Sequence, residues 1–241
     1  MSVNEFGQPL GEVVEGWEPR ARPERVTLEG RYVRLVPLSS AHYSDLYAAT
    51  CGPDDRQRWT YLPAEAPTDL PGLWMLMTAR LEADPTTYVI VAEGGRPAGV
   101  FSLCSVDAAN GSIEIGWVLF GAALQRTRAA TEAIHLLQAY AFDELGYRRL
   151  EWKCDSRNEP SRRAAERFGF TYEGRFRNHR VVKGCNRDSD WFSITDAEWP
   201  ALRQAHEAWL EPANFDADGR QVAPLRRHAP EVTAPSAGPV E

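Results

Sequence analysis

The sequence has few cysteines, no long apolar run and no basic leader. Its four cysteines are widely separated, with no Cys-x-x-Cys pair and no histidine at the spacing of a zinc site. The sequence therefore predicts neither a disulfide framework nor a metal site. No apolar stretch reaches the roughly 20 residues that a membrane helix needs. The first residues, MSVNEFGQPLGEVVEGW, lack the basic and apolar segments of a signal peptide. We expect a cytoplasmic protein without a membrane partner.

Positive charge is also scarce, since the formal net charge is −7. A nucleic-acid-binding protein needs a basic face to neutralise phosphates, so the composition argues against a nucleic-acid partner. Any phosphate-binding site must therefore be a small cluster of residues on an otherwise acidic protein. With 43% hydrophobic and 25% charged residues, the 241-residue chain has the composition of a globular protein with one sizeable core.

Composition changes near both ends of the chain. Residues 1–22 are rich in Pro and Gly, although Phe6, Leu10 and Trp17 could pin this arm to the body. After Leu210 the chain is dominated by Pro, Ala, Gly and charge, and such a segment buries too little apolar surface to offset its ordering entropy. We expect an N-terminal arm (residues 1–22), one domain (residues 23–210) and a disordered tail (residues 211–241).

Strands and helices alternate between these ends. Apolar periodicity predicts strands at residues 31–38, 88–92, 98–106, 113–120, 149–155, 170–176 and 189–195, and helices at 39–50, 69–82, 130–145 and 161–168 and after a cap at Asp196. Gly94-Gly95 and Asn110-Gly111 predict hairpin turns. The strands on either side of helix 130–145 should be parallel, since they flank a crossover. The sequence predicts an α+β protein with a mixed, mostly antiparallel sheet.

Residues 125–133, QRTRAATEA, join a strand to the long helix. Exposed backbone N–H groups and the helix dipole make such a junction an anion site. Arg126 and Arg128 place two cations there, which a bound pyrophosphate would stabilise. Two solvated arginines in a loop explain the segment equally well.

The order of the motifs resembles the GNAT superfamily of N-acetyltransferases. The strand IEIGWVLF, the segment QRTRAATEA, a strand ending in CD, Asn-x-x-Ser at 158–161, and then RFGF and YEGRFR follow in that family's order and spacing. The RimJ/RimL-like branch, which acetylates protein N-termini or small amines, is most similar. The resemblance covers about residues 31–195. It implies the GNAT fold, a twisted sheet with a splayed parallel strand pair and helices on both faces.

The resemblance also implies acetyl-CoA as co-substrate, without a metal. The residues it assigns to cofactor binding are Val118, Gln125, Arg126, Thr127, Arg128, Ala129, Ala130, Thr131 and Asn158. One departure is Arg128, which replaces the central glycine of the family's phosphate loop. Its side chain must point away from the cofactor or replace some backbone contacts with a charge-assisted bond.

Two catalytic residues follow from the resemblance. Ser161 occupies the position near the cofactor sulfur and is the candidate proton donor, since Ala165 stands where many relatives carry a tyrosine. A serine that only bonds helix backbone is the alternative. Glu114 is the candidate base, working through water, and burial would raise its pKa. A solvent-facing strand residue is the alternative for Glu114.

The acceptor side is less defined. Relatives that acetylate ribosomal proteins carry a glutamate where this chain has Asn178, His179 and Arg180, so His179 is a second candidate base. The aromatic residues Trp59, Tyr61 and Trp74 could line the acceptor pocket, or they could belong to the core.

We therefore predict an N-acetyltransferase that acts on a primary amine, either a peptide N-terminal α-amine or a small amine. An α-amine has a pKa near 8, well below that of a lysine side chain, so it suits a site without a strong base. The alternative is a non-catalytic acyl-CoA-binding module, which Arg128 and the missing glutamate favour. The sequence is compatible with a homodimer.

Overall fold

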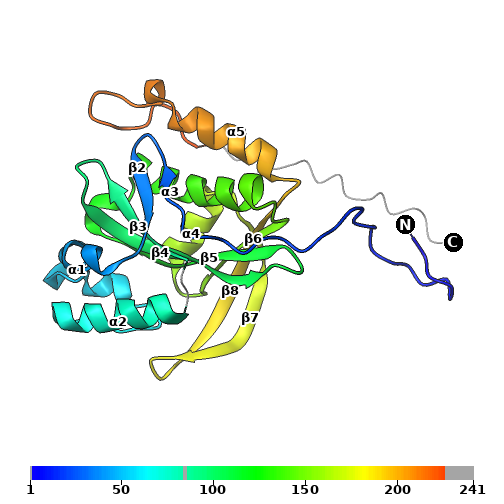
Figure 1. Ribbon diagram of the computed structural model, residues 1–241, viewed down its shortest axis with the longest axis horizontal. Helices are drawn as coiled ribbons and strands as arrows, with labels where there is room; N and C mark the ends of the chain where they lie inside the picture. Colours follow the sequence, from blue (N-terminus) through cyan, green and yellow to red (C-terminus); the bar gives the residue numbers. More distant parts are fainter. Residues whose placement is uncertain (1, 84–85, 226–241) are drawn as a thin grey trace.

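The computed structural model describes residues 2–83 and 86–225. One sheet runs through the molecule in the order β1-β2-β3-β4-β5-β6-β8-β7 (Figure 1). Its strands are β1 (Leu28–Glu29), β2 (Val33–Pro37), β3 (Thr87–Ala92), β4 (Pro97–Asp107), β5 (Ser112–Phe120), β6 (Arg149–Asp155), β7 (Thr171–Val182) and β8 (Cys185–Thr195). Neighbours are antiparallel except β5 and β6, which are parallel. The predicted α+β class and mixed sheet are confirmed.

Helices cover both faces of this sheet, as expected. In Figure 1, α1 (Tyr43–Thr50) and α2 (Leu70–Ala83) lie on one face, and α3 (Arg128–Ala139) and α5 (Trp199–Leu210) lie on the other. Helix α4 (Glu159–Arg167) follows β6. Shorter elements are η1 (Ser40–His42), η2 (Pro53–Trp59), η3 (Ala122–Leu124), the π-helical turn η4 (Tyr140–Glu144) and η5 (Pro212–Asn214). None of the helices in the described ranges is long and apolar enough to cross a bilayer.

Two apolar clusters hold the layers together, one on each face. Strand β3 contributes to both, because successive side chains point to opposite faces. Val89 and Val91 join the cluster under α1 and α2, whereas Tyr88 and Ile90 join the one under α3. Burial on both faces explains why β3 reads as the continuous apolar run TYVIVA.

A buried carboxylate fixes the start of α3 beside β2. Glu132 is 5% exposed, and its two oxygens accept hydrogen bonds from the backbone N–H groups of Arg31 (2.9 Å) and Tyr32 (2.6 Å). Gly30 leaves room for this contact, since a Cβ there would lie 2.5 Å from Glu132 Oε2. The first turn of α3 is therefore held in one position.

The structure corrects three local predictions. The helix expected over residues 130–145 is α3 followed by η4, and Gly146, with φ of +67°, ends it as predicted. The stretch between the strands expected at 170–176 and 189–195 is a continuous hairpin, β7–β8. The cap of α5 is Glu198 instead of Asp196, and its carboxylate accepts a hydrogen bond from Thr195 N at 2.7 Å.

The segment after α5 is placed against the body as far as residue 225, where we had expected disorder from Glu211. Phe215 packs edge-on against Trp209, with ring centroids 5.0 Å apart, and Asn214 donates to the Trp209 carbonyl at 2.9 Å. These contacts hold residues 214 and 215 against the end of α5, whereas most of the side chains in residues 216–224 are exposed. Residues 226–241 lie outside the described residues.

The N-terminal arm is pinned by one of its three candidate residues. Trp17 donates to the Ala109 carbonyl at 3.0 Å, and the Arg20 guanidinium lies 4.5 Å above its ring. Phe6 and Leu10 are exposed. The boundaries proposed at residues 22 and 210 remain a prediction.

Candidate active site

The parallel strands β5 and β6 separate after three residue pairs, of which Glu114 and Glu151 are the last. Beyond Glu114, β5 stays with β4 and β6 continues beside β8. Trp117 adopts a φ of +54° at a register shift between β4 and β5, a local distortion of the kind found beside active sites. A gap therefore opens in the middle of the sheet.

A groove of about 990 Å³ runs from this gap along the start of α3. The predicted cofactor residues that line it are Val118, Gln125, Arg126, Thr127, Arg128, Ala130, Thr131 and Asn158. The Ala129 methyl group packs against the core instead, so only its backbone is available. The C-terminal segment completes the groove with Phe215 and residues 219–221.

The N-terminus of α3 is capped but retains free donors. Thr127 Oγ1 accepts from Ala130 N at 3.1 Å. The backbone N–H groups of Arg128 and Ala129 have no hydrogen-bond partner within the part of the chain that the structure describes. Free N–H groups at a helix start are the donors that bind phosphate in many proteins.

The side chain of Arg128 is held against aromatic rings. Its guanidinium carbon lies 4.2 Å from the Tyr32 ring centroid and 5.4 Å from that of Phe215. The side chain is thus turned toward Tyr32, just before β2, and toward the C-terminal segment, while Arg128 still lines the groove. How this arginine replaces the loop glycine of the family remains a prediction.

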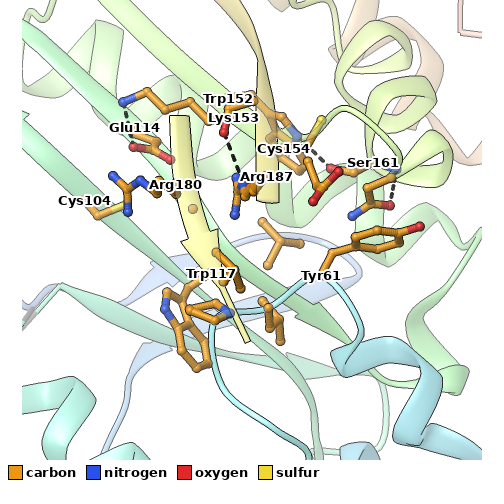
Figure 2. Close-up of a pocket in the computed structure, with 18 of the residues that line it drawn as sticks. Tyr61, Cys104, Glu114, Trp117, Trp152, Lys153, Cys154, Ser161, Arg180 and Arg187 are labelled. Carbon is orange, nitrogen blue, oxygen red and sulfur yellow. Dashed lines mark hydrogen bonds and ion pairs between the residues drawn. The ribbon is translucent and has the colours of Figure 1, made fainter. Parts of the chain in front are cut away.

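A second, smaller cavity of about 300 Å³ lies on the other side of the gap, beneath the β7–β8 hairpin (Figure 2). It contains Glu114 and His179. Five residues line both this cavity and the groove: Arg58, Val118, Trp152, Asn158 and Ser161. The two spaces therefore meet at Ser161.

Ser161 has a side-chain environment suited to proton donation. Its Oγ accepts a hydrogen bond from Trp152 Nε1 at 3.0 Å, so the hydroxyl hydrogen does not serve that contact. Its backbone N–H donates to the capping Asn158 Oδ1 at 3.2 Å. Burial raises the pKa of the neighbouring Cys154 to about 11, and a hydrogen bond with Ser161 partly opposes the shift. Cys154 therefore stays a neutral thiol near pH 7.

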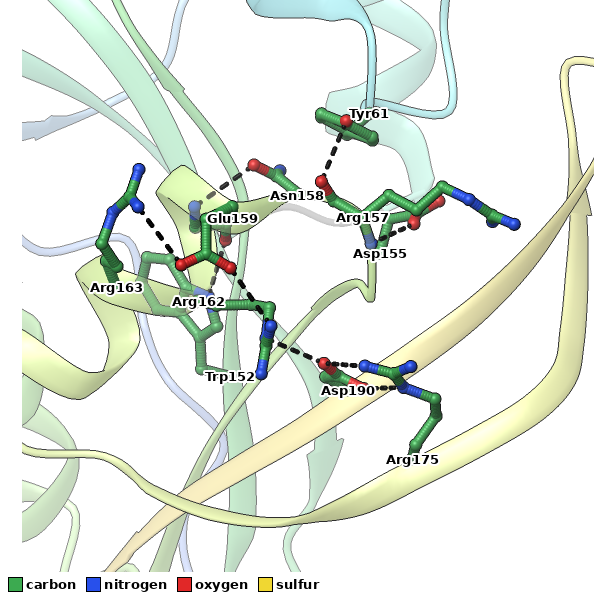
Figure 3. Close-up of polar contacts among 11 residues, drawn as sticks. Tyr61, Trp152, Asp155, Arg157, Asn158, Glu159, Arg162, Arg163, Arg175 and Asp190 are labelled. Carbon is green, nitrogen blue, oxygen red and sulfur yellow. Dashed lines mark hydrogen bonds and ion pairs between the residues drawn. The ribbon is translucent and has the colours of Figure 1, made fainter.

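A polar network fixes α4, which carries Ser161 (Figure 3). Asp190, fully buried, forms ion pairs with Arg162 at 3.0 Å and Arg175 at 2.6 Å, which joins α4 to both strands of the hairpin. On the other side, Tyr61 Oη donates to the Arg157 carbonyl at 3.1 Å. The junction of the two cavities is thus held from both sides.

Glu114 faces the smaller cavity but is not isolated. Its Oε2 accepts from Ser105 Oγ at 2.7 Å and from Lys153 Nζ at 3.0 Å, and Lys153 also contacts Glu151 at 2.9 Å. Burial pulls the pKa of Lys153 down, but the two carboxylates raise it by more, so the ammonium stays charged. The Glu114 charge is therefore neutralised by a partner, which the sequence did not lead us to expect.

The hairpin brings His179 into the same cavity. A bulge at Asn178, with φ of +49°, shifts the register of β7, and His179 Nδ1 lies 2.9 Å from Ser189 Oγ. The hairpin tip is tied down, since Lys183 Nζ donates to the Trp59 carbonyl at 2.7 Å. Burial and then nearby cations, including Arg180, lower the pKa of His179, so its imidazole is neutral near pH 7.

The three aromatic residues divide between the two alternatives, pocket lining and core. Tyr61 lines the cavity. Trp59 is 1% exposed in the core, where it donates to the Thr50 carbonyl, and Trp74 lies half-exposed on α2 against Tyr43. The cavity lies along the gap in the sheet, not under these two residues.

Sequence reasoning missed the arginines of this cavity, which are Arg58, Arg80, Arg180 and Arg187. The signal that could have found two of them is the pair Lys183-Gly184, at which β7 turns into β8 with φ values of +51° and +74°. A two-residue turn with positive φ predicts a tight hairpin, and hence strands running through residues 176–189.

A sequence profile of the GNAT acetyltransferase domain matches residues 33–171. The chain belongs to the GNAT acetyltransferase family. Among solved structures, this GNAT protein is similar to a GCN5-related N-acetyltransferase from Brucella melitensis, with 49% identity, coverage of 88% of this chain and 97% of that one, and a TM-score of 0.85. The predicted family, fold and acyltransferase class are confirmed.

Curated GNAT relatives are more distant. The Bacillus subtilis protein YdaF, named as a candidate ribosomal N-acetyltransferase, is 33% identical over 105 residues, or 44% of this chain, and the match spans 57% of YdaF. The uncharacterized N-acetyltransferase p20 of Bacillus licheniformis is 32% identical over 126 residues, covering 52% of this chain and 70% of p20. The relation to YdaF agrees with the RimJ/RimL-like branch.

Proposed function

We propose that this GNAT protein transfers an acetyl group from acetyl-CoA to the amine of a small molecule or a peptide N-terminus. The observation that carries the proposal is the meeting of two cavities at Ser161. The groove contains a helix N-terminus with free donors, and the smaller cavity contains two groups that can accept a proton. Donor and acceptor would thus reach the gap between β5 and β6 from opposite sides.

The groove residues fit the donor. Free N–H groups at Arg128 and Ala129, together with the exposed side chain of Arg126, would bind the pyrophosphate. Val118, Thr127, Thr131 and Asn158 line the path from there to the junction, as do Gln125 and Ala130. Acetyl-CoA supplies the thioester.

Two proton movements complete the reaction. The amine nitrogen forms a bond to the acetyl carbon while the carbon–sulfur bond breaks, and the departing thiolate takes the Ser161 hydroxyl proton. The proton that the nitrogen loses on amide formation passes through solvent to restore the Ser161 hydroxyl, so the serine is unchanged at the end of the reaction. A coenzyme A thiol has a pKa comparable to that of cysteine, about 8.5, so the help needed from Ser161 is modest.

An acceptor that enters as an ammonium first loses one proton to a base in the smaller cavity, which frees the nitrogen lone pair for the attack. Glu114 and His179 both line it. The Glu114 carboxylate is held by Lys153, and His179 is a neutral imidazole held by Ser189. The pH dependence of kcat/KM in His179→Gln and in Glu114→Gln distinguishes the two candidate bases.

A peptide or small-molecule amine with a low pKa suits this site better than a lysine side chain. An α-amine with a pKa near 8 is about one-third neutral at pH 7.5, whereas a lysine amine is only about 0.1% neutral. The lowered pKa of His179 makes its imidazole a weak base, and an acceptor that needs little deprotonation suits such a base.

The test combines binding and turnover. Isothermal titration with acetyl-CoA should show a single site, and release of free thiol should depend on added amine. Arg96→Glu, on the exposed β3–β4 turn, is the control and should change neither quantity. Cofactor binding without thiol release for any amine in a broad panel would establish the non-catalytic acyl-CoA-binding module instead. Absence of binding would contradict both functions.

A further inference from the structure

The smaller cavity is cationic although the protein is acidic. Its described lining contains five permanent cations, Arg58, Arg80, Lys153, Arg180 and Arg187, and two carboxylates, Glu114 and Asp155. The net formal charge of the whole chain is −7. A concentration of positive charge in a concave, low-dielectric site raises the local concentration of anions and favours their binding.

Two of these cations already have carboxylate partners. Lys153 is shared between Glu114 and Glu151, and Arg58 pairs with Asp55 at 2.7 Å. These ion pairs hold together the walls of the smaller cavity. Arg80 lies over the Trp117 ring, 5.2 Å from its centroid, so the charge considered for a ligand is that of Arg180 and Arg187 on the hairpin.

Arg180 and Arg187 are directly opposite each other on the antiparallel strands of the hairpin. Like charges at such positions repel and destabilise a strand pair. Among the described residues, neither guanidinium forms an ion pair within 4.0 Å. An anion placed between them would reverse the sign of this interaction.

Arg187 is the better enclosed of the two. It is half-buried, and its Nε donates to the buried Ser189 Oγ at 3.1 Å, which fixes the direction of the side chain. Burial lowers its pKa, with Asp155 opposing the shift from beyond ion-pair distance. Figure 2 shows Arg187 in the middle of the lining residues, with Arg180 beside Glu114. A partly desolvated guanidinium with no carboxylate in contact is costly, and a bidentate carboxylate is its best complement.

We propose that the acceptor is an amine that also carries a carboxylate, and that Arg187 and Arg180 bind this carboxylate. The inference rests on the proposed acetyl transfer and specifies the substrate class. The carboxylate can be the α-carboxylate of an amino acid or an acidic side chain near a peptide N-terminus. In both cases the arginine pair orients the amine toward the junction at Ser161, and His179 and Glu114 line the same cavity.

The test compares matched acceptors that differ only in the carboxylate. One arm uses amino acids and their amides, compared at equal concentration of neutral amine. The other uses short peptides with Asp or Asn at the second position. We expect kcat/KM to be at least tenfold higher for the carboxylate member of one arm, which also identifies the source of the anion. In Arg187→Gln this preference should fall to about twofold or less, through a rise in KM.

Controls separate charge recognition from folding. Arg177→Gln, exposed on β7 outside the cavity lining, should keep the preference. The melting temperature of Arg187→Gln should equal or exceed that of the parent, because a like-charge pair has been removed. If Arg187→Gln is poorly folded, Arg180→Gln supplies the same comparison.

Binding gives a second readout. The N-acetylated carboxylate product, titrated into the protein loaded with CoA, should bind at least tenfold more weakly to Arg187→Gln. Equal kcat/KM for both members of both arms in the parent protein would overturn the inference and leave acetyl transfer intact. Absence of turnover with every amine would contradict the proposed function. In that case equal product binding by parent and variant would overturn the carboxylate site as well.

Discussion

The groove beside α3 and the cavity beneath the hairpin are built in different ways. Much of the groove comes from one stretch, the end of β5 and the start of α3, together with α4. The cavity needs segments from across the chain, and the bond that closes its hairpin, from Lys183 to Trp59, spans 124 residues. Local sequence therefore specifies the donor side, whereas tertiary contacts specify the acceptor side. Substitutions in the groove and in the cavity should therefore affect donor binding and acceptor use separately.

The largest expected effect is on the donor side alone. Arg126→Glu reverses an exposed charge at the start of α3, so it should raise the Kd for acetyl-CoA about 100-fold by replacing attraction to phosphate with repulsion. Pantetheine analogues without the pyrophosphate should bind as they do to the parent protein. Calorimetry on both ligands checks this. An equal loss for both would mean that the groove is disrupted as a whole.

Ser161 lies where the two sides meet, so its loss should affect chemistry and neither binding event. Ser161→Ala should lower kcat by about tenfold and by no more than about 100-fold, with acetyl-CoA affinity within a few-fold of the parent. The deficit should shrink with a donor whose thiol is more acidic. A parent rate with acetyl-CoA would make Ser161 structural.

Loss of the serine also removes the acceptor for the Trp152 indole. An unpaired buried donor costs about 1–3 kcal/mol, so the stability of Ser161→Ala must be measured beside its rate. Ser161→Cys, which retains a weak acceptor and a more acidic proton, is the matched variant. It should recover part of the rate.

The acceptor side should respond to pH. Cations near His179 disfavour its charged form, so removing one in Arg187→Gln should raise the His179 pKa toward its ordinary value of about 6.5. If His179 is the base, activity falls as the pH drops through its pKa. The acidic limb of kcat/KM should therefore move to higher pH in this variant, by about one unit or less.

The same profile separates the two candidate bases. His179→Gln should abolish the acidic limb if the imidazole is the base, and Glu114→Gln should abolish it if the carboxylate is. Acetyl-CoA affinity should be unchanged in both variants, as measured by calorimetry. An unchanged profile in both would assign deprotonation to solvent.

The smallest effect concerns the C-terminal segment. Phe215→Ala removes one ring beside Arg128 and one wall of the groove, so the Kd for acetyl-CoA should rise about three- to tenfold. Phe6→Ala, an exposed aromatic in the N-terminal arm, is the control. An unchanged Kd would show that this segment only covers the outside of the groove.

The groove could be predicted from the sequence, whereas most of the cavity beneath the hairpin could not. Alternation, turn pairs and the helix start predicted the sheet order around β5 and β6, and the phosphate segment came from contiguous residues. Strand β7 was truncated because Arg177, Asn178 and Arg180 interrupt its apolar alternation. The ion pair of Glu114 with Lys153 was also missed, since it joins residues 39 positions apart on neighbouring strands. Such contacts cannot be predicted from the sequence until the register of the strands is known.

A crystal structure with acetyl-CoA and a carboxylate-bearing amine analogue would show directly whether donor and acceptor meet at Ser161 from the two cavities. We expect the pyrophosphate at the N–H groups of Arg128 and Ala129, the thioester sulfur within hydrogen-bond reach of Ser161 Oγ, and the carboxylate on Arg187. A cofactor bound outside the groove, or an acceptor that reaches the thioester without entering the hairpin cavity, would contradict this expectation.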